Sequence, residues 1–307
     1  MNGKDIGFAV LVALIWGLNF PVVKVGLEEL PPLLFTAVRF ALASIPAVFF
    51  VPLPQVPWFI VVTIGLLLGV FKFGLLFLAL ESNISAGLAS LLMQAQVLFT
   101  ILLSCVFLRE PIRRRQWAGL ILCMAGFVLF LLVAGGSVTV VGIALILGSA
   151  SAWALSNVLT KQLKQVNVVH LTVWMSIVAP IPLAVLSWFT ETTQPLQVLA
   201  QAGLSTWLAV IYTSYGATLV AVALWALLLR RHAAATVTPF ALLIPVVGMG
   251  SSALWLGERL ELSESIGAAL ILIGLAVITW HVPRRASTSS VNHPSNRSKH
   301  NDTLETT

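Results

Sequence analysis

Charged residues are scarce in this sequence, and so are cysteines. Asp, Glu, Lys and Arg together make up 9% of the 307 residues, whereas apolar residues make up 59%. A soluble domain has about 25% charged residues, so this composition excludes an ordinary soluble enzyme, a disordered chain and a coiled coil. The two cysteines, Cys105 and Cys123, are too few for a disulfide framework and are expected only to pack. The sequence therefore indicates a membrane protein whose charges are confined to loops.

Motifs of enzymes and of metal or cofactor sites are absent as well. The sequence contains no P-loop and no HExxH motif, and its five histidines lack ligand spacing. The stretch from Gly248 to Ala253 fits GxGxxA, but it lies inside an apolar run and not in a strand–turn–helix unit. We therefore expect no enzyme, no catalytic residue, no metal and no cofactor. The net charge of +6 is interpreted as a topology signal and not as a nucleic-acid surface.

Apolar runs long enough to cross a bilayer recur along most of the chain. A spanning helix needs about 20 apolar residues. The first run is longer than the apolar core of a cleaved signal peptide, so we expect it to be the first helix of the bundle. We predict an all-α membrane protein with ten transmembrane helices, over residues 6–23, 33–51, 58–80, 86–108, 116–134, 140–160, 169–189, 205–229, 233–256 and 263–281.

Basic residues mark one side of this predicted protein. Most of the 17 Lys and Arg residues, Arg113 to Arg115 among them, fall in loops on the side of the N-terminus. Loops rich in Lys and Arg stay in the cytoplasm, so we expect both termini there, in a multi-pass protein of a bacterial inner membrane. The lipid bilayer is one expected partner, nucleic acid is not, and a homodimer stays open. Residues 283–307 are polar and are expected to form a disordered tail.

Two sequence matches indicate that the chain consists of two related halves. A tryptophan and a lysine share one spacing in both halves, at Trp16 and Lys24 and at Trp153 and Lys161. A glutamate and two glycines recur 148 positions later: Glu110, Gly119 and Gly126 become Glu258, Gly267 and Gly274. Five spans per half is an odd number, so the second half would be inverted. We expect inverted repeats over 1–134 and 135–282, a plan typical of secondary transporters with a midplane site between the halves.

Several of these segments resemble one transporter family. They are WGLNFPVVKVGL in the first span, the Arg39-Phe40 pair, AGLASLLMQAQVLFT in the fourth span and LGERL around Glu258. They are similar to the EamA branch of the drug/metabolite transporter superfamily, and most of all to its bacterial exporters of O-acetylserine and cysteine. The resemblance implies ten helices, cytoplasmic termini and metabolite export by alternating access. Lys72 departs from it, because a neutral polar residue is expected at that position.

Lys72 is the most informative candidate residue. It lies 14 positions after Trp58, at the start of its span, which is about 21 Å along a helix. A lysine at the bilayer centre costs about 2.5–3.5 kcal/mol, and every Asp and Glu lies in a loop, at a helix end or in the tail, so none offsets this cost within a span. Small residues on the same helical face, Gly65 and Gly69, predict that Lys72 faces the bundle. Either a substrate carboxylate binds it, or water solvates it in a cavity without a substrate role.

Six further residues are candidates for substrate binding. Arg39 can either snorkel to Glu28 or Glu29 at the outer surface or line a substrate gate. The other five are polar or aromatic residues within spans, and they fit a small polar solute: Asn19, Gln94, Gln96, Trp153 and Tyr212. The alternative is that they only tie helices together, at about 0.6 kcal/mol per hydrogen bond.

The sequence thus favours a secondary transporter that exports small amino-acid-like metabolites, of the cysteine or O-acetylserine type, by alternating access. An exporter of lipophilic drugs is one alternative, and its activity would be indifferent to Lys72→Gln. A membrane-embedded lipid enzyme is a second, but clustered His or acidic residues near one interface are missing. A non-transporting membrane subunit that acts through its tail is a third.

Overall fold

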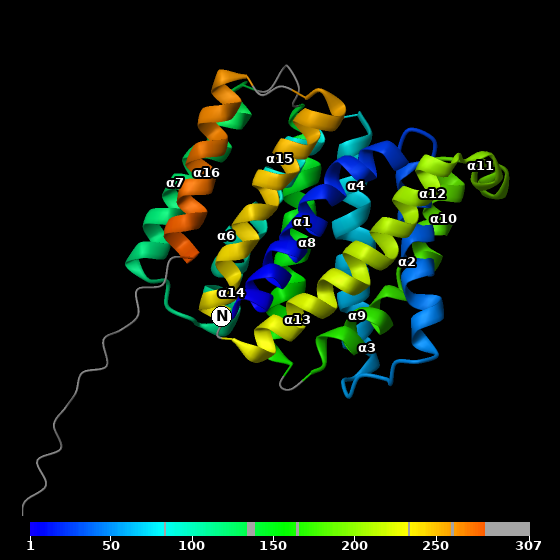
Figure 1. The fold of residues 1–307 in the computed structure, drawn as a ribbon, viewed down its shortest axis with the longest axis horizontal. Coiled ribbons are helices and arrows are strands. Elements are labelled where there is room, and N and C mark those ends of the chain that lie inside the picture. Colours follow the sequence, from blue (N-terminus) through cyan, green and yellow to red (C-terminus); the bar gives the residue numbers. More distant parts are fainter. Residues whose placement is uncertain (83, 134–138, 164–165, 233, 259–260, 280–307) are drawn as a thin grey trace, which may run out of the picture.

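The protein is an all-helical bundle in a computed structural model that describes residues 1–82, 84–133, 139–163, 166–232, 234–258 and 261–279 (Figure 1). No β-strand occurs among these residues. The predicted all-α class is therefore confirmed. The expected tail, residues 283–307, lies outside the described residues.

Some of the expected spans are single α-helices. They are α1 (Gly3–Gly26), α2 (Pro32–Val48), α7 (Arg114–Val133), α8 (Val140–Gln162) and α16 (Leu262–Thr279). Their sequences are apolar along most of their length, and α1 and α2 continue through an internal proline, Pro21 and Pro46.

The other expected spans consist of successive helical pieces. Proline explains two of the breaks, because Pro180 begins α10 and Pro239 lies in the short 3-10 helix η3. Two spans contain π-helical turns, η1 and η2, which the sequence did not predict. The pieces are α3 (Trp58–Gly65), η1 (Leu66–Phe73) and α4 (Gly74–Ser82); α5 (Ala86–Leu92) and α6 (Ala95–Leu108); α9 (Val168–Ser176) and α10 (Pro180–Thr190); α12 (Leu204–Ile211), η2 (Tyr212–Val220) and α13 (Ala221–Arg231); and α14 (Ala234–Val237), η3 (Thr238–Leu242) and α15 (Leu243–Leu256). A short outer helix, α11 (Pro195–Gln201), connects α10 to α12.

Seven of these segments are long and apolar enough to cross a membrane: Gly3–Gly26, Trp58–Glu81, Ala86–Leu108, Val140–Gln162, Val168–Thr190, Leu204–Arg231 and Thr238–Leu256. Two shorter apolar helices, Pro32–Val48 and Glu264–Thr279, coincide with two more of the expected spans. The one remaining expected span, 116–134, coincides with α7.

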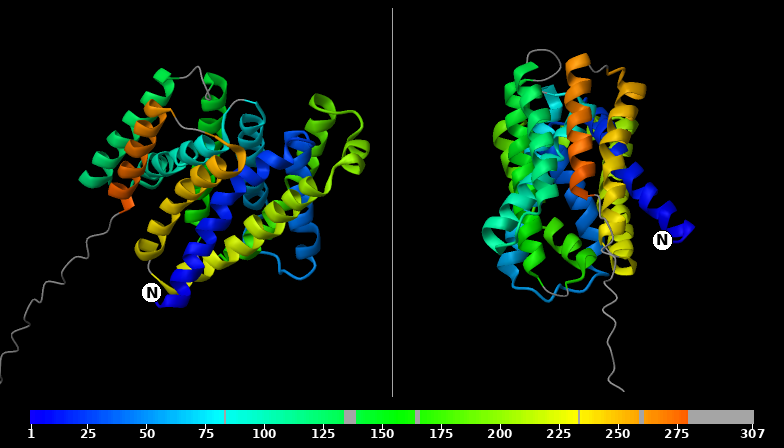
Figure 2. Two further views of the ribbon diagram at one scale, coloured as in Figure 1. Left: turned by 45° about the horizontal axis from the view of Figure 1, so that its top comes forward. Right: turned by 90° about the vertical axis from the view of Figure 1, so that its left-hand side faces the viewer.

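Helix α1 runs through the middle of the bundle, where it packs against α5, α12, α13 and α15. Helix α8 packs against α4, α6 and η1, and small residues such as Ala150 and Ala154 on α8 are fully buried. Helices α7 and α16 lie side by side at one edge of the bundle, and α2 packs against α10 toward the opposite edge (Figures 1 and 2).

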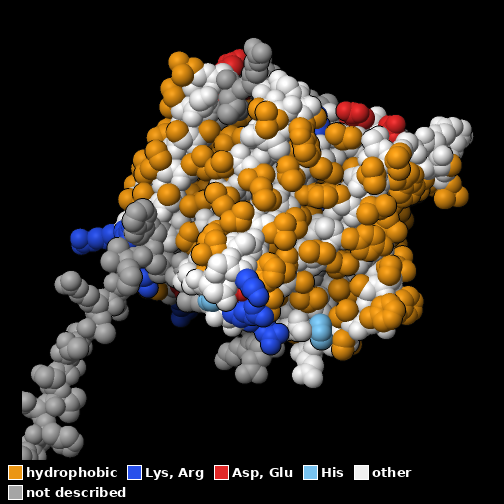
Figure 3. All heavy atoms as spheres, viewed as in Figure 1, with side chains coloured by type: hydrophobic (Ala, Val, Ile, Leu, Met, Phe, Trp, Pro, Cys, Tyr) orange, Lys and Arg blue, Asp and Glu red, His pale blue; other side chains and the backbone are white. Residues whose placement is uncertain are grey.

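The outer surface is apolar around its sides and charged at its two ends. Large apolar side chains stand exposed, for example Phe50 at 86% and Leu254 at 85%. Figure 3 shows hydrophobic side chains across the visible face, Lys and Arg gathered toward the end where the N-terminus lies, and Asp and Glu toward the other end. We call these the basic end and the acidic end. An apolar belt between charged ends fits a bilayer, because lipid tails cannot solvate exposed polar groups.

Candidate functional site

The Lys72 side chain lies between two aromatic rings inside the bundle. Its Nζ atom is 3.7 Å from the ring centroid of Phe73 and 4.0 Å from that of Trp153 on α8. The Lys72 carbonyl accepts a hydrogen bond of 2.6 Å from the Ser149 hydroxyl, which fixes η1 against α8. Lys72 belongs to the π-helical turn η1, and such turns are frequent at functional sites because they re-aim side chains.

Arg39 of α2 is a second cation in this region, and only 2% of it is exposed. Its Nε and Nη2 atoms donate to the Thr218 hydroxyl of η2, at 3.3 and 3.0 Å. Its Nη1 atom is buried without a hydrogen-bond partner among the described residues. The Glu29 carboxylate instead accepts hydrogen bonds from Gly203 N–H and Thr206. Of the two alternatives for Arg39, snorkelling to Glu28 or Glu29 or lining a gate, the first is not seen, because Arg39 binds Thr218 and forms no ion pair in the described part of the chain.

The two cations share one aromatic ring. The Arg39 Cζ atom lies 4.1 Å from the Phe73 centroid, so Phe73 contacts both positive groups. Each contact with an aromatic face contributes about 0.5–2 kcal/mol. This gain is smaller than the cost of keeping like charges close together in an apolar interior. Neither cation has a salt-bridge partner within the described part of the chain. A negatively charged group from outside the protein would complete this cluster.

A row of polar residues continues from this cluster along α6 and α8. The Asn157 amide donates to Gln96 Oε1 at 3.1 Å and to the Thr100 hydroxyl at 3.3 Å. Ser149, Trp153 and Asn157 are four positions apart, so they lie on one face of α8. Of the predicted site residues, Trp153 thus contacts Lys72 directly, and Gln96 is joined to the same face of α8 through Asn157.

Asn157 and Phe73 are candidate site residues that the sequence analysis missed. Asn157 continues the four-residue spacing of Ser149 and Trp153, so the spacing itself was the available signal. The Ser156 hydroxyl donates to the Trp153 carbonyl of its own helix, at 2.8 Å. Phe73 carried no signal, because a phenylalanine in an apolar run is ordinary.

The remaining predicted site residues lie at other places in the bundle. Gln94 is buried at the joint between α5 and α6. Asn19 of α1 is 7% exposed, and its Oδ1 atom has no hydrogen-bond partner among the residues described. The Tyr212 hydroxyl donates to the Ile15 carbonyl at 2.7 Å, and Trp16 Nε1 donates to the Ala217 carbonyl at 3.0 Å. Tyr212 therefore ties η2 to α1.

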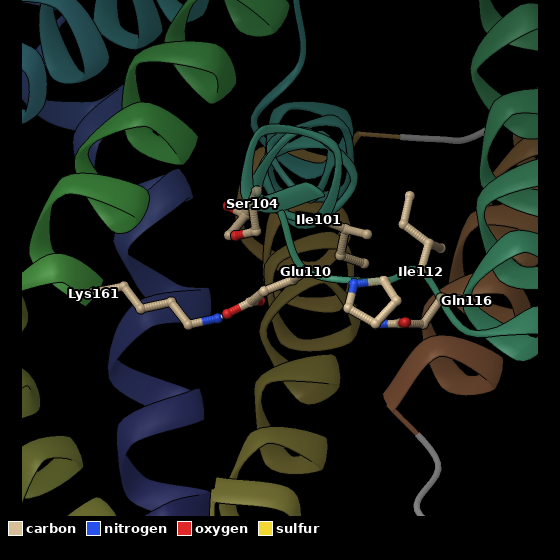
Figure 4. A pocket seen from close by; sticks show the side chains of 8 residues that line it. Ile101, Ser104, Glu110, Ile112, Gln116 and Lys161 are labelled. Carbon is tan, nitrogen blue, oxygen red and sulfur yellow. The ribbon is translucent and has the colours of Figure 1, made fainter. Parts of the chain in front are cut away.

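A hollow of about 170 Å³ opens where the α6 and α8 ends meet (Figure 4). Its lining includes Thr100, Ile101, Ser104 and an ion pair in which Lys161 Nζ is 2.7 Å from Glu110 Oε2. The hollow belongs to the basic end, because α6 and α8 both end there. Thr100 also accepts the Asn157 amide. One residue therefore borders both the hollow and the polar row that leads to Lys72.

Glutamates at the acidic end accept hydrogen bonds from helix N-termini far away in the sequence. Glu258 accepts from Ala86 N–H and Gly87 N–H of α5, at 2.8 and 2.9 Å. Glu191 accepts from the first N–H groups of α2. Glu29 accepts from Gly203 N–H at 2.7 Å and from the Thr206 hydroxyl at 2.6 Å. The Thr206 hydrogen bond and the Gly203 N–H lower the Glu29 pKa from its ordinary value, because both stabilise the ionised form.

An apolar helical bundle that holds a polar, cationic cluster inside it and a hollow at one end has features expected of a membrane transporter. The comparison with known proteins specifies the class. The EamA-like transporter family matches residues 4–132 and 140–280, and the chain belongs to this family. It is a multi-pass inner-membrane protein and a transporter instead of an enzyme, as the sequence indicated.

Individual relatives agree with this assignment. The chain is 38% identical over 285 residues to a protein of Salmonella typhimurium named "Probable amino-acid metabolite efflux pump", covering 90% of this chain and 95% of that one. It is 37% identical over 284 residues to an Escherichia coli protein of the same name, with the same coverage. A solved structure titled "Crystal structure of protein" is similar at a TM-score of 0.64 and 22% identity, covering 91% of this chain and 99% of that one, which supports the fold.

Proposed function

We propose that this protein exports small amino-acid-like metabolites, of the cysteine or O-acetylserine type, by alternating access. The observation that carries the proposal is the pair of cations over Phe73, since a carboxylate is the group that Lys72 and Arg39 lack. The relatives named amino-acid metabolite efflux pumps support the same substrate class.

The proposal gives each part of the cluster a role. Lys72 and Arg39 bind the substrate carboxylate, the Trp153 ring covers one side, and Gln96 with Asn157 orients the remaining polar groups. An aromatic face can also hold the substrate ammonium group, because aromatic rings attract cations. Gln94 and Asn19 would complete the pocket from the helix joint and from α1 in another conformation.

The membrane arrangement is part of the proposal. We infer ten transmembrane helices in two inverted repeats, over 1–134 and 135–282, with the basic end and both termini in the cytoplasm. Lys and Arg at one end of the bundle support this orientation (Figure 3). Two π-helical turns at comparable places in the two halves, η1 and η2, support the repeat. The bilayer surrounds the apolar belt, and a homodimer remains an arrangement to be tested by mass measurement in detergent.

The test is counterflow in proteoliposomes. Proteoliposomes that contain the purified protein are loaded with unlabelled cysteine or O-acetylserine, and uptake of the labelled solute is followed. Lys72→Gln removes the charge in the cluster, and Lys4→Gln removes an exposed charge as the matched control. We expect saturable exchange that Lys72→Gln abolishes and Lys4→Gln preserves. Exchange that Lys72→Gln leaves unchanged would remove Lys72 from the site. Absence of exchange with any amino acid, from folded protein, would overturn the substrate class and favour lipophilic drugs.

A further inference from the structure

Two ends of the bundle are built alike, at positions 148 residues apart. Helix α6 ends with Arg109 at φ 54°, and helix α15 ends with Gly257 at φ 65°. In both, the next residue is a glutamate. Glu110 N–H donates to the Ser104 carbonyl at 3.4 Å, and Glu258 N–H donates to the Ser252 carbonyl at the same distance. The two glutamates therefore leave equivalent helix ends with equivalent backbone geometry.

The contact between α7 and α16 repeats the same correspondence reciprocally. A Cβ atom on Gly119 would lie 2.6 Å from the Gly274 carbonyl oxygen, and a Cβ atom on Gly126 would lie 2.7 Å from the Gly267 carbonyl oxygen. Gly119 thus faces Gly274, the position matched to Gly126, and Gly126 faces Gly267, the position matched to Gly119. Such reciprocity is what a two-fold relation between inverted halves produces, so matched positions can be compared between the two ends.

The two matched glutamates differ in what their carboxylates contact. The Glu258 carboxylate accepts both Ala86 N–H and Gly87 N–H, and so holds α5 against the acidic end of α15. The positions matched to 86 and 87 are the first two of α14. Glu110 instead lies 2.7 Å from Lys161, beside the open hollow. At the acidic end the glutamate thus holds a helix start, and at the basic end the glutamate pairs with a lysine beside a hollow.

The lysines are matched too. Lys24 and Lys161 are the equivalent positions of the Trp–Lys match. Lys161 pairs directly with Glu110, whereas Lys24 donates to the Leu80 carbonyl and forms no ion pair with Glu258 in the described part of the chain. Each end therefore contains a glutamate, a lysine and a helix start, and the two ends show the two different pairings of the same three groups.

We propose that Glu110–Lys161 and Glu258–Lys24 form a paired switch that sets which end of the transporter is open. At the open end the glutamate pairs with its lysine, and at the sealed end it accepts the N–H groups of α5 or α14. In the opposite state Glu258 pairs with Lys24, and Glu110 accepts the N–H groups at the start of α14. This inference rests on the proposed alternating access, and it adds the residues that position each gate.

Accessibility of one cysteine in the hollow tests the switch without any substrate. Cys105 and Cys123 are replaced by serine, and Ile101→Cys places one thiol in the lining of the hollow. A membrane-impermeant maleimide then labels this thiol from either side of oriented vesicles. Lys161→Gln frees Glu110 to hold α14, so we expect labelling from the basic end to fall severalfold. Lys4→Gln is the matched control and should leave labelling unchanged.

A second variant separates the switch from simple damage. Lys24→Gln removes the alternative partner of Glu258, so it should favour the state that is open at the basic end. The double variant Lys24→Gln, Lys161→Gln should therefore recover labelling toward that of the parent. Unchanged labelling in Lys161→Gln, or a double variant that labels no better than Lys161→Gln alone, would overturn the proposal. Counterflow distinguishes the two proposals. If the variants change labelling as expected but the protein exchanges no amino acid, the switch is retained and only the proposed substrate class is overturned.

Discussion

Arg39 of α2 donates two hydrogen bonds to the hydroxyl of Thr218, which is 179 positions away on η2. The same hydroxyl donates to the Thr213 carbonyl, five positions back in its own π-helical turn. Thr218 therefore satisfies part of a buried guanidinium and at the same time supports the backbone geometry of η2. The arginine keeps one nitrogen, Nη1, without a partner in the described residues, and this is the group that a substrate carboxylate would reach.

Replacement of Thr218 should show how much the bundle depends on this contact. Thr218→Val keeps the side-chain volume but leaves more of Arg39 unsatisfied, which costs about 1–3 kcal/mol for a buried group. We expect a lower midpoint of thermal unfolding in detergent and weaker counterflow. Thr218→Ser retains the hydroxyl and should behave like the parent. Equal stability of the valine and serine variants would show that Arg39 does not need this hydrogen bond.

Phe73 should matter for its ring and not only for its volume. Phe73→Leu removes the face that both Lys72 and Arg39 contact. Loss of one such contact, about 0.5–2 kcal/mol, corresponds to roughly a two- to thirtyfold higher half-saturation concentration in counterflow. Phe73→Tyr keeps the ring and should stay close to the parent. A leucine variant with unchanged half-saturation would mean that the ring does not position the cations.

The glycine contact between α7 and α16 should tolerate no side chain. A Cβ atom at Gly274 would lie 2.6 Å from Cys123 Sγ and 2.7 Å from the Gly119 carbonyl oxygen. Gly274→Ala therefore forces the helices apart, and overpacking of this kind costs about 1–3 kcal/mol. Gly250→Ala on α15 is the control, because a Cβ atom there meets nothing within 4 Å. Thermal unfolding of both variants checks the difference, and a Gly274→Ala variant as stable as Gly250→Ala would contradict it.

Acid should weaken the contact between Glu29 and the start of α12. The folded protein lowers the Glu29 pKa below the ordinary value of 4.5, so this group stabilises the protein above that pH. The stabilisation is lost as the pH falls through the lowered pKa. The midpoint of thermal unfolding is measured for Glu29→Gln and for the parent between about pH 3 and pH 7, a range that includes the model-peptide pKa of glutamate. The two midpoints should differ most at neutral pH and converge in acid. A constant difference across this range would exclude Glu29 as the source.

The sequence was sufficient for the class of fold because apolar length determines it. Long runs with few charges predict membrane helices whatever their neighbours are, and the helices begin and end within a few residues of the expected spans. The sequence did not predict where a span changes from one kind of helix to another. The π-helical turns η1 and η2 depend on packing against α2 and α8, and no local signal marks them.

The candidate site was only partly predictable for the same reason. Lys72 was identified because a charge in an apolar run is conspicuous, and Trp153 because a repeat marked it. Asn157 was hidden among ordinary polar residues of α8, and the Glu258 contact with Ala86 joins positions 172 residues apart. A single sequence gives the cost of a buried group, but it does not give the partner that offsets the cost.

Thr100 borders both the hollow at the basic end and the polar row of Asn157. A solute that enters there would lose its water in stages, first beside the Glu110–Lys161 pair, next against hydroxyl and amide groups, and last at the cations over Phe73. Each stage replaces only part of the hydration shell with protein groups. Small successive exchanges avoid both a high barrier and a deep minimum, and a carrier with neither can release its cargo as readily as it takes it up.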